Sequence, residues 1–115
     1  MKLEDRDRLF LLRMIEHCER IEKAKQRFGS TFQHFQDDPD YRDVVCMNIF
    51  QIGELANQIS EKAENSLNDI PWRQMYAIRN ILAHAYIKVD HKIVWDTVVH
   101  DIPQLSERLK NITNL

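Results

Sequence analysis

The stretch from Val45 to Ala63, VCMNIFQIGELANQISEKA, decides the fold. Its apolar residues recur at alternating steps of four and three: Val45, Ile49, Ile52, Ala56, Ile59 and Ala63. This spacing is typical of an α-helix that packs nearly parallel to a neighbouring helix. Gly53 lies inside the stretch and costs a helix roughly 1 kcal/mol relative to alanine. A close approach of a second helix at Gly53 would offset that cost.

The same kind of periodicity continues on both sides of this stretch. We predict long helices over residues 4–28, 39–63, 71–85 and 91–112, with a short extra turn at 31–36 and a loop at 64–70. Only two glycines and three prolines occur in the 115 residues, as expected for a chain built from a few long helices. The predicted fold class is all-α: an antiparallel four- to five-helix bundle that forms a single domain over residues 1–115.

Helix start and stop signals support these boundaries. Gly29 stands at the usual C-terminal capping place, and Asp38 can cap a helix that has Pro39 in its first turn. Asp90 can cap the last helix, and Pro103 should kink it because proline lacks a backbone donor. Two further apolar stripes should face the core. They are Leu11, Ile15, Cys18, Ile21 and Phe28 in the first helix, and Val94, Val98, Ile102, Leu105, Leu109 and Ile112 in the last.

Charge and cysteine content narrow the class of protein. The formal net charge is −2 and the pI is about 6.2, which argues against general coating of nucleic acid. A local basic bias remains in residues 71–92. This segment has one acidic residue, Asp90, and four basic ones: Arg73, Arg79, Lys88 and Lys92. Cys18 and Cys46 lie on apolar helix faces, so we expect buried free thiols in a reducing cytoplasm. We expect neither a signal peptide nor a membrane span.

Polar residues gather in the segment from Ile78 to Tyr86, IRNILAHAY. On a helical wheel Met75, Ile78 and Leu82 share the face that should point to the core. Asn80 and His84 are four residues apart and point the opposite way, and Arg79 lies between the two faces. Tyr76 and Ala83 flank Asn80, which indicates a covered face. A second copy of the chain is the simplest cover, so we predict a homodimer.

Histidine and arginine together suit the cleavage of RNA. A histidine near its ordinary pKa can take and give a proton at neutral pH. An arginine stays charged, and its planar donors match phosphate oxygens. Less specific interpretations also exist: a histidine at an interface, or an Arg-Asn pair that only caps and bridges. The other histidines are scattered and form no convincing metal pair: His17, His34, His91 and His100.

The pattern Arg79-x4-His84-x-Tyr86, with Asn80 directly after the arginine, resembles the motif of HEPN domains and specifically of HepT-like toxins. Three further segments resemble that family in the same order: Ile52-Gly53-Glu54, Ile70-Pro71-Trp72-Arg73, and Val89-Asp90 followed by Val94-Trp95 and Asp101-Ile102-Pro103. One departure is Ala85, where the family often has glycine.

The resemblance implies an all-helical homodimer that acts as a metal-independent endoribonuclease toxin of a type VII-like toxin–antitoxin module, with no cofactor. Arg79 and His84 would be catalytic together with Asn80, and Glu54 would orient Arg79. A MntA-like nucleotidyltransferase antitoxin would silence the toxin by attaching AMP to Tyr86. Two alternatives remain: a non-catalytic nucleotide-binding or regulatory subunit of such a nucleotidyltransferase, and a plain interaction bundle.

Overall fold

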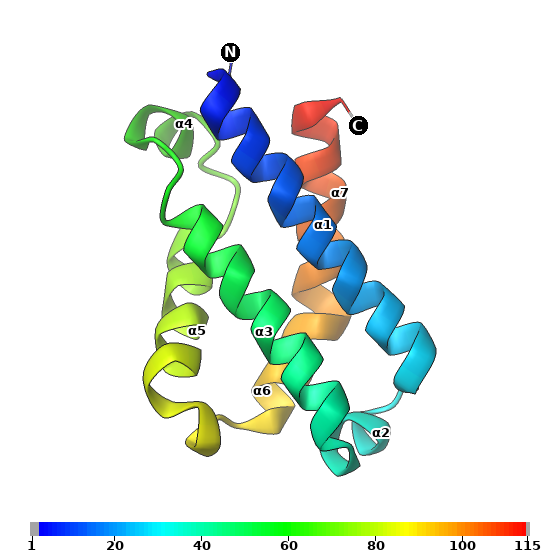
Figure 1. Cartoon of the computed structure of the whole chain (residues 1–115). Coiled ribbons are helices and arrows are strands. Elements are labelled where there is room, and N and C mark those ends of the chain that lie inside the picture. Colours follow the sequence, from blue (N-terminus) through cyan, green and yellow to red (C-terminus); the bar gives the residue numbers. More distant parts are fainter. Residues whose placement is uncertain (1–2, 115) are drawn as a thin grey trace.

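The computed structural model describes residues 3–114, and within that range the chain is helical with no strand (Figure 1). The elements in order are α1 (Asp5–Phe28), α2 (Phe32–Asp37), α3 (Pro39–Ala56), α4 (Glu61–Ser66), α5 (Trp72–Ala85), the 3₁₀ turn η1 (Tyr86–Lys88), α6 (His91–Asp96), the π-helical turn η2 (Thr97–Asp101) and α7 (Ile102–Thr113). The long helices alternate in direction, and both labelled termini lie at one end of the bundle (Figure 1). The predicted antiparallel helical bundle is confirmed.

The core forms where α1 packs against α3 and α7, while α5 packs chiefly against α3. All six residues of the predicted Val45–Ala63 stripe are buried. The α1 stripe is buried from Leu11 to Ile21, and Phe28 is half-buried and stacks on Tyr41 with ring centroids 5.1 Å apart. Gly29 ends α1 with φ 122°, a conformation that favours glycine, and its N–H donates to the Lys25 carbonyl. Sequence periodicity therefore identified most of the core correctly.

The predicted helix over 39–63 is wrong at its C-terminal end, and so is the first part of the predicted loop at 64–70. Helix α3 ends at Ala56, and α4 begins at Glu61. Ser60 caps α4 by accepting the Ala63 N–H, while the buried Asp7 of α1 accepts from the Ser60 N–H at 2.9 Å and hydroxyl at 2.7 Å. These capping bonds compete with a continuous helix.

The last helical stretch is also interrupted, next to the predicted irregularity at Pro103. Pro103 lies within the first turn of α7, and the irregularity falls just before it, in the π-helical turn Thr97–Asp101. Proline removes a backbone donor and crowds the turn before it, which accounts for the change of helix type at this place. The predicted inner face is buried except for Ile112, which is half-buried. None of the described helices has the length and apolar character that a membrane crossing requires.

Candidate active site

Helix α5 carries the motif and is fixed at its start by Trp72. The indole N–H of Trp72 donates to the Leu67 carbonyl at 3.0 Å, and Met75 and Leu82 are buried against the bundle. Ile78 is half-buried and packs against the core, so all three residues face the bundle as predicted. The helix ends at Ala85 and passes into η1 at Tyr86, as predicted.

Arg79 is held by three residues of α3. A side chain built at Gly53 would place its Cβ 2.4 Å from Arg79 Cβ and 3.2 Å from the Met75 carbonyl oxygen, so only glycine permits this approach of α3 and α5. The Glu54 carboxylate accepts from Arg79 Nε in an ion pair. The guanidinium also lies 5.4 Å from the centroid of the Phe50 ring. The close helix approach expected at Gly53 is thus present, and Glu54 contacts Arg79.

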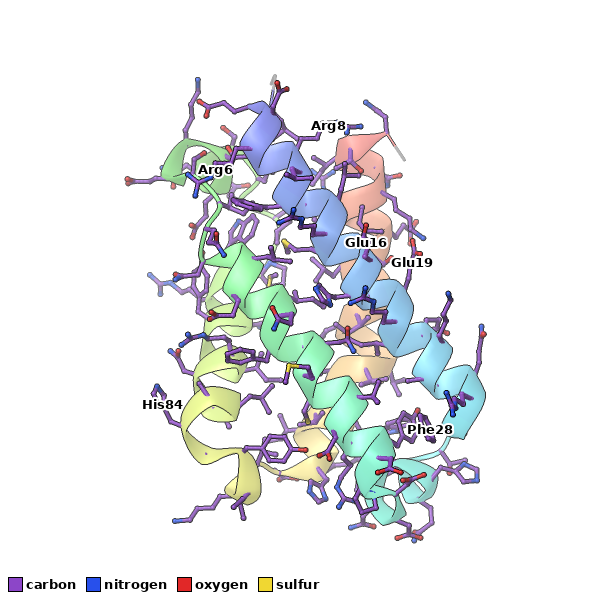
Figure 2. The ribbon with its side chains drawn as sticks, viewed as in Figure 1. Arg6, Arg8, Glu16, Glu19, Phe28 and His84 are labelled. Atoms are coloured by element: carbon purple, nitrogen blue, oxygen red, sulfur yellow. The ribbon has the colours of Figure 1, made fainter. Side chains whose placement is uncertain are left out.

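Asn80 connects Arg79 to the exposed face of α5. Its side-chain oxygen accepts from Arg79 Nη1 at 3.0 Å. Asn80 and His84 are both exposed and four residues apart, which makes them neighbours on one helix face. His84 points away from the bundle (Figure 2). The guanidinium therefore reaches from the α3 contact toward the face that presents the imidazole, and a phosphate could lie between them.

Tyr86 extends the site toward the start of α3. Its hydroxyl donates to Asp43 of α3, and the side chain is 40% exposed. Burial of the hydroxyl, and then its bond to Asp43, raise the pKa of Tyr86 above its usual range. Sequence reasoning missed Asp43, because it lies 43 residues before Tyr86 and its local surroundings carry no motif.

The surroundings of Tyr76 remove one reason for the prediction that a second copy of the chain covers this face of α5. Its hydroxyl donates to the Ala56 carbonyl at 3.2 Å and to the Glu64 carboxylate at 3.1 Å, so the chain itself half-buries this tyrosine. Ala83 is exposed. Tyr76 is therefore no sign of a second copy.

A different surface of α5 is incompletely covered. An apolar groove of about 360 Å³ runs beside α5, between it and the α6–η2–α7 stretch. Ile81 on one side is 45% exposed and Ile93 on the other is 56% exposed. Half-buried Ile78 also lines the groove. This surface lies on the same helix as His84, although the side chains of Arg79, Asn80 and His84 do not line it.

Two of the other histidines have polar partners, and both cysteines are buried. His17 Nδ1 lies 2.8 Å from Asn48 Oδ1, and His34 Nδ1 lies 2.9 Å from the Thr31 hydroxyl. Burial raises the pKa of the Cys18 thiol to about 12 and that of Cys46 to about 11, and both thiols are free. Among residues 3–114 no cluster of His, Cys, Asp and Glu could hold a metal ion.

The positive charge predicted for residues 71–92 is partly neutralised by an ion pair. Lys92 pairs with Asp96 at 3.3 Å and lies over the Phe32 ring. Arg73 and Lys88 are exposed, and Arg73 lies about three helical turns before His84 on the same face of α5. Cations that could meet an RNA backbone therefore flank the motif.

Comparison with known proteins gives this site its class. The model of the HepT-like ribonuclease family matches residues 14–112, which include every motif residue of α5 and η1. The chain therefore belongs to the HepT-like ribonuclease family.

Individual relatives agree with this assignment. The chain is 31% identical to the "Probable ribonuclease HepT" of Thermococcus cleftensis over 97% of its own length and 98% of that protein. It is 28% identical to a candidate RNase of Caldanaerobacter subterraneus over 91% of its length and 92% of the relative. No solved structure matches the chain. The predicted resemblance to HepT-like ribonucleases is confirmed.

Proposed function

We propose that the chain is a metal-independent endoribonuclease that acts as the toxin of a two-gene module in the cytoplasm. His84 removes the proton of a ribose 2′-OH, and the freed oxygen attacks the adjacent phosphorus. Arg79 stabilises the negative charge that develops on the phosphoryl oxygens. A second histidine protonates the leaving 5′-oxygen, so the RNA is left with a 2′,3′-cyclic phosphate and a 5′-hydroxyl.

The contact between Arg79 and Asn80 carries this proposal. It turns the guanidinium toward the helix face on which His84 is exposed. The two motif residues are separated by about 7.5 Å along the helix axis, from a rise of 1.5 Å per residue. A phosphodiester placed beside Asn80 could accept from the guanidinium and still present its ribose to the imidazole.

The second proton-transfer group comes from a second copy of the chain. The groove beside α5 supports this part of the proposal, because exposed Ile81 and Ile93 would be removed from water by a partner helix. A two-fold arrangement about this surface would bring the histidine of each copy toward one cleft.

Regulation would act at Tyr86. A nucleotidyltransferase antitoxin would attach AMP to the phenol oxygen, which lies at the end of the motif helix and is partly exposed. The added group would bring negative charge to the end of the motif helix and repel the RNA backbone. Ala85, where relatives of the motif often have glycine, does not prevent η1 from presenting Tyr86.

The decisive test is RNA cleavage by the purified protein in the presence of EDTA. Wild-type protein should release fragments that end in 2′,3′-cyclic phosphate. His84→Ala should reduce the cleavage rate by about 10²–10⁴-fold, while its free energy of unfolding changes by less than about 0.5 kcal/mol because the side chain is exposed. His100→Ala is the matched control, since His100 is also exposed.

The same experiment separates the alternatives. A regulatory subunit of a nucleotidyltransferase would bind ATP through the motif and cleave no RNA in any variant. A plain interaction bundle would cleave no RNA in any variant, and His84→Ala would lower its stability without a functional defect. Cleavage that survives His84→Ala at the wild-type rate would contradict the proposed chemistry.

A further inference from the structure

The protein has three tyrosines, and their hydroxyl groups have different surroundings. Tyr41 is fully buried, and its hydroxyl donates to the Gly29 carbonyl at 2.9 Å. The Tyr76 hydroxyl is shared between a backbone carbonyl and the Glu64 carboxylate, and its side chain is half-buried. Neither hydroxyl is presented to a large reagent that approaches from solvent.

Tyr86 combines accessibility with a carboxylate partner. The ring is 40% exposed and Asp43 is exposed as well, yet the two side chains are joined directly by a hydrogen bond. This bond links the first half of α3 to the turn that follows the motif helix. Tyr86 is therefore the most exposed of the three tyrosines, and a carboxylate is already in contact with its phenol proton.

We propose that Asp43 is the catalytic base for the modification of Tyr86. The inference rests on the proposed function, because it deepens the assignment of Tyr86 as the modified residue. The phenol oxygen attacks the α-phosphorus of a nucleoside triphosphate, and an oxygen–phosphorus bond forms. The bond from that phosphorus to pyrophosphate breaks, and pyrophosphate leaves with the electron pair. Asp43 takes the phenol proton and later releases it to water.

A base is needed because the tyrosine is a poor nucleophile on its own. A tyrosine hydroxyl is protonated at neutral pH, and the raised pKa of Tyr86 disfavours its phenolate further. A carboxylate in hydrogen-bond contact can accept the proton as the new bond forms, as the catalytic aspartate of protein kinases does for a substrate hydroxyl. The positive charge of Arg42 of α3 also acts on this hydroxyl and favours an incoming phosphate.

The test uses a small fluorophosphonate as the phosphorus electrophile. Tyr86 attacks its phosphorus, fluoride leaves, and the adduct is located by mass spectrometry of tyrosine peptides. Asp43→Asn retains an oxygen that can accept the hydrogen bond but is not a base. It should slow labelling of Tyr86 by about 10-fold or more, given that a positioned base typically contributes 10²–10⁴-fold. Glu64→Gln is the matched control and should leave Tyr86 labelling at the wild-type rate.

The pH dependence adds a second readout. In Asp43→Asn the reaction should need the phenolate, so labelling should rise about tenfold per pH unit between pH 7 and 9, whereas wild-type labelling should change much less. Circular dichroism and thermal unfolding would show whether each variant is folded, and Asp43→Ala provides a second variant that lacks both the base and the hydrogen bond.

Two outcomes would overturn the inference. One is a folded Asp43→Asn protein that is labelled at Tyr86 as fast as the wild type. The other is wild-type protein in which Tyr76 is labelled in preference to Tyr86. Labelling needs neither RNA nor a partner protein. A failure to cleave RNA would therefore count against the proposed nuclease. The rates of Tyr86 labelling would still decide whether Asp43 acts as the base.

Discussion

Arg79 and His84 lie five residues apart on α5, yet their side chains differ in burial and in the contacts they make. Arg79 is half-buried and is held by an ion pair, a hydrogen bond and the face of a phenyl ring, over a glycine that lets two helices meet. His84 is exposed on the outer face of the helix (Figure 2). One half of the motif is thus positioned within a single chain, whereas the other half is open to a second molecule.

In the proposed reaction, this difference decides where each residue would obtain its geometry. A guanidinium fixed by its own chain can bind phosphate without rearrangement, which lowers the entropic cost of the reaction. An exposed imidazole has no such restraint, and in the proposed reaction it would gain one from RNA or from a second copy of the chain. Substitutions near Arg79 should therefore act through the fold, and substitutions near His84 should act through assembly.

The largest effect should come from a charge placed on the groove face. Ile81→Asp puts a carboxylate at a position that is 45% exposed in the single chain and would be buried in the proposed dimer. We expect monomers by light scattering and a loss of RNA cleavage similar to that of His84→Ala, about 10²–10⁴-fold, because an unpaired buried charge strongly opposes association.

Ile87→Asp is the control for that experiment. Ile87 is 95% exposed and lies outside the groove, so its replacement should leave both assembly and cleavage intact. An Ile81→Asp monomer that cleaves RNA at the wild-type rate would show that His84 needs no second copy.

The next effect should come from Gly53→Ala. Alanine would favour the isolated helix by about 1 kcal/mol. Its Cβ, however, would lie 2.4 Å from Arg79 Cβ and 2.8 Å from Arg79 Cγ, so α3 and α5 must separate. We expect a net destabilisation of about 1–3 kcal/mol in chemical denaturation, typical of an overpacked contact. Displacement of Arg79 should also slow cleavage by about 10²-fold. A variant that is more stable and fully active would refute the close-contact explanation.

The sequence predicted the parts of the molecule that depend on periodicity. The stripes of α1, α3 and α7 and the caps at Gly29, Asp38 and Asp90 are local features, and the structure confirms them. The break after Ala56 depends on Asp7, which reaches Ser60 from 53 residues away. Local patterns carry no information on such a contact.

The candidate site shows the same division. The motif residues were found because they are adjacent on one helix, and Glu54 was found because it lies in a segment that resembles the family. Asp43 was missed because only the packing of η1 against α3 brings it to Tyr86. The surface for a second copy was inferred from Tyr76, although the exposed isoleucines of the groove give the stronger physical reason.

The smallest effect should come from Glu54→Gln, which tests how much of the Arg79 position depends on charge. Glutamine can still accept from Arg79 Nε, and the wild-type ion pair is 28% exposed on the arginine side and 35% on the glutamate side. Loss of a pair this exposed should change the free energy of unfolding by no more than about 1 kcal/mol. We expect kcat to fall by about 10-fold with KM little changed, because a looser guanidinium weakens stabilisation of the transition state more than binding of RNA. Glu61→Gln, at an exposed position of α4, is the control. An equal rise in KM with unchanged kcat would mean that Glu54 serves RNA binding and does not orient Arg79.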